Sequence, residues 1–119
     1  MELINFETMN YNNKKFKAIS NSENGEISEE TIFHYKQERN LLTCEYYGGK
    51  IIKGHLIGLV DKNGIINMRY HQVNKLNEIM TGVCFSKPEI MENGKIRLLE
   101  EWQWTSGDLS KGNSVLEEI

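Results

Sequence analysis

The sequence contains little proline or cysteine and no long apolar run. Its 119 residues include one proline, Pro88, and two cysteines, Cys44 and Cys84. The two cysteines form neither a CxxC motif nor a disulfide framework, so we expect reduced thiols and a cytoplasmic location. The apolar stretches are too short for a membrane-spanning helix, and the first residues lack the basic and apolar regions of a secretory signal. We therefore expect no membrane partner.

Positive charge is not in excess either. Lys and Arg number 14 and Asp and Glu 17, which gives a formal net charge of −3 at pH 7. Because such a chain has no general positive field for a phosphate backbone, we expect no nucleic-acid partner. The length predicts one domain over residues 1–119 with a single core. Residues 1–13 are polar and weakly patterned, and we interpret them as an N-terminal extension or an edge strand.

Turn-forming dipeptides recur along the chain at similar intervals. They are Asn24-Gly25, Gly48-Gly49, Asn63-Gly64 and Asn93-Gly94. The segments between them are rich in β-branched and aromatic residues, which favour strands. The predicted strands are 16–21, 31–38, 41–47, 51–60, 65–73, 78–86, 95–104 and 114–119. This pattern predicts an all-β fold, an antiparallel up-and-down meander of about eight strands that closes into a small calycin- or lipocalin-like barrel.

Two features interrupt the strand pattern. Residues 28–31 are polar and acidic and precede Ile32 and Tyr35, so a short helix is the alternative there. The β-branched and aromatic residues that follow favour a strand instead. Pro88 has no N–H to donate to a neighbouring strand, and we expect it to end the sixth strand.

Hairpin geometry predicts which side chains share a face of the sheet. The turn at residues 61–64 pairs Val60 with Ile66, and a one-residue slip would mix the two faces. The predicted inward side chains of these two strands are Ile52, Gly54, Leu56, Gly58, Val60, Ile66, Met68 and Tyr70. The predicted outward ones are Lys53, His55, Ile57, Asn67, Arg69 and His71.

Neighbouring hairpins extend this inward set. A tight turn at residues 39–40 pairs Phe33 with Tyr46, and a three-residue loop at 48–50 sets Tyr46 beside Ile52. In the sixth strand the more apolar face, which we assign inward, carries Ile79, Thr81, Val83 and Phe85. In the seventh strand the inward face carries Ile96, Leu98, Glu100, Trp102 and Trp104.

Polar side chains on the inward face make the barrel interior a candidate ligand site. A small eight-stranded barrel either fills its interior with side chains or holds one small ligand near its mouth, and both alternatives stay open. A carboxylate is costly inside a barrel unless it is paired or protonated, so Glu100 either has a role in binding or lies at the open end in water. The predicted ligand-binding residues are Tyr35, Tyr46, Tyr70, Gln72, Glu100, Trp102 and Trp104.

The histidines and cysteines give no clear chemistry. The register places His55 opposite His71 on the outer face, near His34, but no short ligand motif joins them, so we expect no metal and no other cofactor. The sequence lacks glycine-rich phosphate loops, serine-nucleophile elbows and zinc-protease motifs. Both cysteines lie within predicted strands, and we identify no catalytic residue.

Several stretches resemble a known family. They are Ile32-Phe33-His34-Tyr35, Ile57-Gly58, Asn67-Met68-Arg69-Tyr70, Ile79-Met80-Thr81-Gly82 and Glu100-Glu101-Trp102-Gln103-Trp104-Thr105. Over about residues 9–119 the chain resembles short bacterial proteins labelled N-acetylglutamate synthase or hypothetical. That label implies an acetyltransferase that makes N-acetylglutamate from glutamate and acetyl-CoA. The barrel pattern itself is more similar to lipocalin-like barrels that hold small ligands.

Three functions follow from these observations. The first hypothesis is a non-catalytic barrel that binds a small apolar or amphipathic ligand in its mouth. The second is the acetyltransferase that the label implies. The third is a structural or interaction module in which exposed strand edges, or the outward Ile57 and Leu99, build a homodimer.

Overall fold

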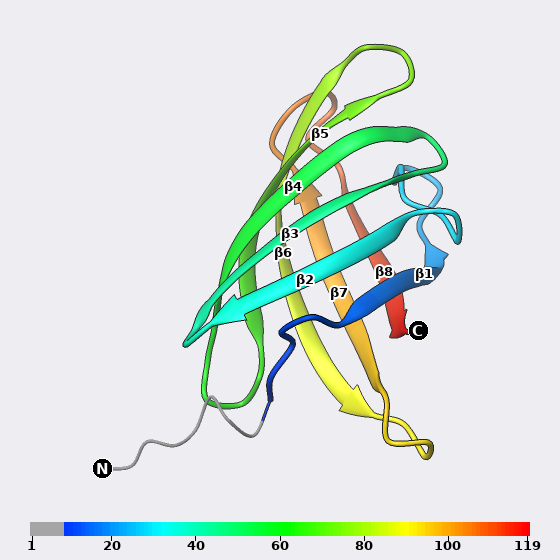
Figure 1. Cartoon of the computed structure of the whole chain (residues 1–119). Helices are drawn as coiled ribbons and strands as arrows, with labels where there is room; N and C mark the ends of the chain where they lie inside the picture. The colour runs from blue at the N-terminus through cyan, green and yellow to red at the C-terminus, as the bar shows by residue number, and fades with distance from the viewer. Residues whose placement is uncertain (1–8) are drawn as a thin grey trace.

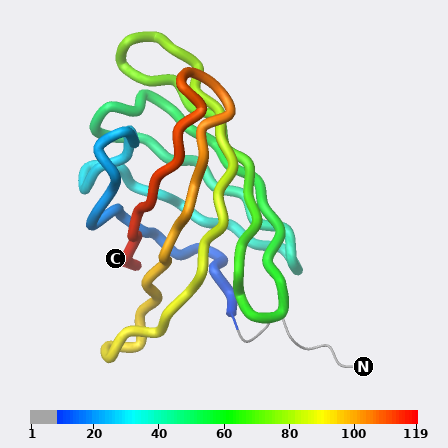
Figure 2. Tube along the Cα trace, turned by 180° about the vertical axis from the view of Figure 1, so that it is seen from behind, coloured from blue at the N-terminus to red at the C-terminus, as the bar shows by residue number. Residues whose placement is uncertain are grey.

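The computed structural model describes residues 9–119, and these form a barrel of eight antiparallel strands (Figure 1). The strands are β1 (Lys15–Asn21), β2 (Ile32–Glu38), β3 (Leu41–Gly48), β4 (Ile51–Val60), β5 (Ile66–Asn74), β6 (Ile79–Ile90), β7 (Ile96–Trp104) and β8 (Lys111–Glu118). Each strand pairs with the next along the chain, and β8 pairs with β1. Seen from behind, β8 lies between β7 and β1, which closes the barrel (Figure 2). The predicted fold class is confirmed.

No helix occurs in the described residues 9–119. The segment for which a helix was the alternative forms a turn, in which the Thr31 amide donates to the Ser28 carbonyl at 2.9 Å, and β2 follows it. Accordingly, no helix in this part of the chain is long and apolar enough to cross a membrane.

The turn between β4 and β5 has the predicted register. Val60 lies opposite Ile66, and the Asp61 carboxylate accepts hydrogen bonds from the amides of Asn63 and Ile65. Gly64 has a φ of 83°, which a side chain other than glycine adopts rarely. The turn between β2 and β3 also gives the predicted pairing of Phe33 with Tyr46. Two of the three inferred hairpins are therefore confirmed residue by residue.

The turn between β3 and β4 differs from the prediction. Gly48 pairs directly with Ile51, so the loop has two residues and not three, and Tyr46 lies beside Gly54. Register irregularities in both strands then turn Ile51 into the core, where it is 2% exposed, and leave Ile52 51% exposed. The assignment of Ile52 to the inward face was wrong, because a bulge reverses the alternation of side chains locally.

The inward face of β6 was also assigned wrongly. Its buried residues are Gly82, Cys84 and Ser86, whereas Ile79 and Phe85 are more than half exposed. The neighbouring strands explain why this face of β6 points inward. Tyr70 lies opposite Gly82, and a Cβ at position 82 would collide with the Tyr70 ring. Small residues face inward on β6 because large aromatic side chains from β5 and β7 occupy the space. Thr81 and Val83, which we expected inside, likewise belong to the outward set and are partly exposed.

Pro88 does not end the sixth strand. It lies inside β6, opposite Leu98 of β7. The pairing of β6 with β5 stops at Ser86, so on that side Pro88 has no strand partner and its missing N–H costs no ladder hydrogen bond.

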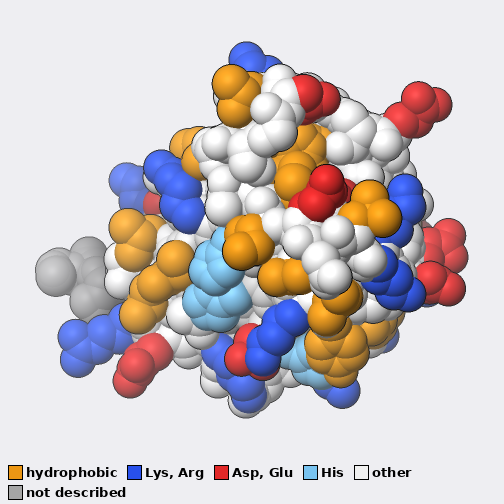
Figure 3. Space-filling view, turned by 90° about the horizontal axis from the view of Figure 1, so that it is seen from above, with side chains coloured by type: hydrophobic (Ala, Val, Ile, Leu, Met, Phe, Trp, Pro, Cys, Tyr) orange, Lys and Arg blue, Asp and Glu red, His pale blue; other side chains and the backbone are white. Residues whose placement is uncertain are grey.

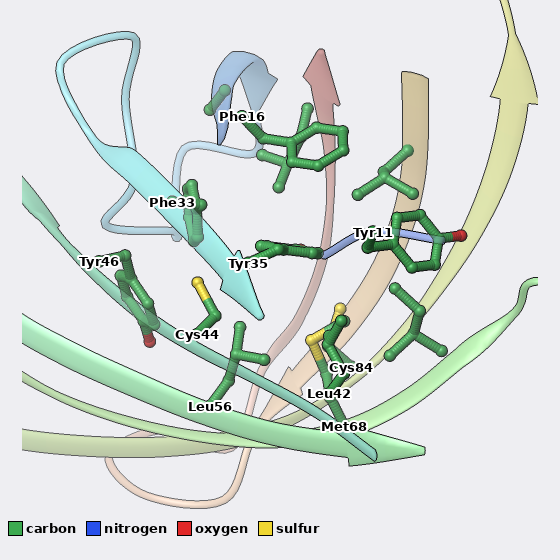
Figure 4. Packing of buried hydrophobic residues seen from close by; sticks show 14 of the residues in the cluster. Tyr11, Phe16, Phe33, Tyr35, Leu42, Cys44, Tyr46, Leu56, Met68 and Cys84 are labelled. Atoms are coloured by element: carbon green, nitrogen blue, oxygen red, sulfur yellow. The ribbon is translucent and has the colours of Figure 1, made fainter. Parts of the chain in front are cut away.

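The chain before β1 contributes to the core and adds no edge strand within residues 9–14. Tyr11 is fully buried against Phe16 and Tyr35, and its hydroxyl donates to the Gly64 carbonyl at 2.6 Å (Figure 4). It thereby fills the end of the barrel at which β4 turns into β5. The part of the predicted extension in residues 1–8 lies outside the described residues.

Candidate functional site

A cavity of about 50 Å³ lies inside the barrel. One water needs roughly 10–15 Å³, so the space corresponds to about four water-sized groups. Its lining comprises Asn21, Gly25, Glu26, Ile27, Phe33, Tyr35, Tyr46, Leu56, Met68, Tyr70, Gln72, Cys84, Glu100, Trp102, Trp104 and Ser114. All seven residues predicted from the sequence as ligand contacts are among them. The structure brings them together, and their role in binding stays a prediction.

Glu100 of β7 points into the barrel and not into water. Its side chain is 7% exposed, and its two carboxylate oxygens accept hydrogen bonds from the hydroxyls of Ser86 and Ser114, each at 3.0 Å. Burial raises the pKa of Glu100 to about 7, against the opposing effect of these two hydrogen bonds. The group therefore titrates near neutral pH.

The Tyr35 hydroxyl is a buried polar group without a hydrogen-bond partner in the described residues. Its side chain is fully buried and packs on Phe16, with ring centroids 4.9 Å apart. Burial, with a smaller contribution from the Glu100 charge, raises the pKa of this phenol well above its usual value. Figure 4 shows Tyr35 of β2 across the interior from Leu56 and Met68. A buried polar atom of this kind needs a partner, which a ligand in the cavity can supply.

A chain of hydrogen bonds runs from the wall of the cavity to its mouth. The Tyr46 hydroxyl donates to Gln72 at 2.7 Å, and the Gln72 amide donates to the Glu26 carboxylate at 2.8 Å. Asn74 donates to the other oxygen of Glu26, also at 2.8 Å. Tyr46 takes this position because Gly54 opposite it has no Cβ, and any side chain there would collide with the ring.

Three aromatic side chains form one wall near the mouth. Trp104 makes edge-to-face contacts with both Tyr70 and Trp102, with ring centroids 5.8 and 5.5 Å apart. Gly112 lies opposite Trp102 on β8 and leaves room for its indole ring. The aromatic alternation along β7 therefore serves both the core and the cavity.

The segment between β1 and β2, residues 22–31, lies over the mouth. Glu26 joins it to β5 as described above, and the Trp104 indole N–H joins it to β7 by donating to the Asn24 carbonyl at 3.0 Å. The side-chain amide of Asn21, the last residue of β1, donates to the Ile27 carbonyl, while the Asn21 side-chain oxygen is buried without a partner in the described residues.

Sequence reasoning missed this segment because Asn24-Gly25 resembles an ordinary hairpin turn. A ten-residue connection with an acidic residue between glycine and isoleucine was the available signal. Viewed from above, hydrophobic and histidine side chains, together with some acidic ones, lie in the middle of the surface, and most Lys and Arg side chains lie toward its edge (Figure 3).

The histidines and cysteines show no arrangement that favours metal binding or nucleophilic catalysis. The rings of His55 and His71 lie side by side on the outer face, with centroids 5.4 Å apart, and residues 9–119 contain no group of three or more metal-binding side chains. Burial raises the pKa of both Cys44 and Cys84, which disfavours their nucleophilic thiolate forms.

Comparison with known proteins identifies the family. Residues 9–119 match the family described as Avidin-like protein. The chain belongs to the Avidin-like family. No curated protein and no solved structure matches it. The eight-stranded closed meander agrees with this membership, whereas the comparisons give no support to the N-acetylglutamate synthase label.

Proposed function

We propose that this Avidin-like barrel binds a small molecule inside its mouth and does not catalyse a reaction. The observation that carries the proposal is the cavity, together with the Glu100 carboxylate that faces it. Burying a carboxylate costs free energy and adds nothing to apolar packing. Ligand sites commonly combine apolar and aromatic walls with a few polar groups, and this interior has that composition.

Family membership supports a small-molecule ligand. The family is named after avidin, a biotin-binding protein. Biotin has several times more non-hydrogen atoms than the roughly four water-sized groups that the cavity holds, so we infer that it would enter only with residues 22–31 displaced outward. We therefore expect a ligand smaller than biotin when this segment is in place.

The location of the protein and its oligomeric state are proposals as well. A cytoplasmic location is supported by two unpaired, buried cysteines, Cys44 and Cys84. A homodimer is supported by the exposure of Ile57 on the outer face. No specific observation favours acetyl transfer.

The test uses the two tryptophans, Trp102 and Trp104, which both line the cavity. We expect that at least one of three probes, propan-1-ol, propylammonium or propionate, shifts their indole N–H signals in NMR spectra of the ¹⁵N-labelled protein. The Cys84→Met variant places a longer side chain in the cavity and should abolish the shifts.

The matched control is Val83→Met on the same strand, since Val83 faces outward and is partly exposed. It should respond as the wild type does. If no probe shifts either indole signal, or if the shifts survive in Cys84→Met, the proposed function is wrong.

A further inference from the structure

The charged groups at the cavity are all acidic. Glu100 lies at its inner wall and Glu26 at its mouth, and the lining drawn from residues 9–119 includes no Lys, Arg or His. Neither carboxylate forms an ion pair in this part of the chain; their hydrogen-bond partners are neutral hydroxyl and amide groups. Two uncompensated carboxylates create a negative potential, which disfavours an anionic ligand and favours a cationic one.

The uncharged part of the lining suits a cation as well. Trp102, Trp104 and Tyr70 present aromatic rings, whose faces attract cations. The Tyr35 hydroxyl is fully buried beside the cavity and lacks a partner in the described residues, so its oxygen is free to accept a hydrogen bond. An ammonium group carries three N–H donors and no acceptor, and it can donate to this oxygen and to a carboxylate at the same time.

We propose that the cavity binds a small organic cation, an alkylammonium of about four non-hydrogen atoms, whose N–H groups face Glu100 and whose alkyl chain packs against the aromatic wall. This inference rests on the proposed function. The two serines that donate to Glu100 hold its carboxylate in place and leave further lone pairs for the ligand.

Cation binding is linked to the proton on Glu100. The pKa of about 7 means that the carboxyl group is mostly protonated at pH 6 and mostly ionised at pH 8. The titratable groups that face it are Tyr35 of β2, Cys44 and Tyr46 of β3, Tyr70 of β5 and Cys84 of β6. Burial raises the pKa of each of them, so they stay neutral over this range, and an alkylammonium stays charged.

The test compares propylammonium with propan-1-ol and propionate, which have similar chains but different charge. At pH 8 we expect propylammonium to bind at least about tenfold more tightly than either of the others, measured from the indole shifts of Trp102 and Trp104. The Glu100→Gln variant should lose this preference, so that propylammonium binds it no more tightly than propan-1-ol does. Glu101→Gln, an exposed position next in the same strand, should change neither affinity.

The wild-type pH profile gives a second readout that needs no variant. Propylammonium affinity should fall about tenfold between pH 8 and pH 6, while propan-1-ol affinity stays constant. A flat propylammonium profile, or binding of propan-1-ol or propionate as tight as that of propylammonium, would overturn the inference and leave the proposed function standing. Absence of binding by all three probes would overturn both.

Discussion

Glu100 is held inside the barrel at a cost in free energy that its two hydrogen bonds only partly offset. The hydroxyls of Ser86 and Ser114 favour the ionised form, but burial outweighs them and raises the pKa to about 7. Tyr35 adds a second unfavourable feature, because its buried hydroxyl has no partner in the described residues. Groups that lower the stability of the fold in this way often mark sites where they are needed for binding.

The first prediction concerns the pH dependence of stability. Between pH 4.5 and pH 7 folded Glu100 keeps a proton that the unfolded chain releases, so the free energy of unfolding falls as pH rises through this window and then levels off. We expect Glu100→Gln to remove this fall and to exceed wild-type stability at pH 8 by about 3 kcal/mol. Urea unfolding of the wild type and the variant at pH 4 and pH 8 measures this gain in stability. If the two proteins differed equally at both pH values, the raised pKa of Glu100 would be contradicted.

The second prediction compares two buried tyrosines. Tyr35→Phe removes a hydroxyl that has no partner, so we expect unchanged or higher stability. Tyr46→Phe removes the donor to Gln72 and should lower the free energy of unfolding by about 1 kcal/mol. Chemical unfolding of both variants under one condition decides the matter. The reverse order would show that the Tyr35 hydroxyl has a partner and that the cavity is filled.

At the level of elements, the hairpins show what the sequence determines. Asp61 and Gly64 specify one loop conformation, so the register of β4 and β5 was predictable. Gly48 and Gly49 allow several loop lengths, and the bulges that reverse Ile52 have no local sequence signal. On β6 the more apolar face is the outer one, because the facing rings of β5 and β7 need the space. That preference depends on tertiary packing and cannot be read along one strand.

The third prediction concerns the segment 22–31. Glu26→Gln replaces one acceptor oxygen by an NH2 group, which then faces the amide donor of either Gln72 or Asn74, so the segment should open more often. We expect hydrogen exchange at the Gly25 amide to become about tenfold faster, with strand amides unchanged. Glu29→Gln, exposed in the same segment, is the control. Unchanged exchange at Gly25 in the Glu26 variant would show that this carboxylate does not hold the segment down.

At the scale of the whole molecule, the strand count and the turns together imply a closed barrel, and the candidate site follows from closure. Side chains from all eight strands converge on one cavity, although these strands are spread along the whole described chain. The seven predicted ligand contacts could be derived from the sequence, because the regular alternation of side chains along a strand places them inside the barrel. The position of residues 22–31 over the mouth and the packing of Tyr11 could not be derived in this way, since both lie in loops without a repeating side-chain pattern.

The fourth prediction tests how the barrel end is sealed. Tyr11 fills this end and ties the chain before β1 to the loop that holds Gly64. Tyr11→Ala should lower the free energy of unfolding by about 3–5 kcal/mol, the usual range for losing a large buried aromatic side chain. Tyr11→Phe should cost only about 1 kcal/mol, since it removes the hydrogen bond alone. Equal losses in both variants would show that the hydroxyl, and not the ring, seals the end.

The central claim is that a ligand enters the barrel interior, and intermolecular nuclear Overhauser effects test it most directly. With propylammonium present at pH 8, the account predicts contacts from the propyl protons to the Met68 methyl group and to the indole of Trp102, which line the cavity. Contacts confined to outward side chains such as Phe85, with none to Met68, would contradict it.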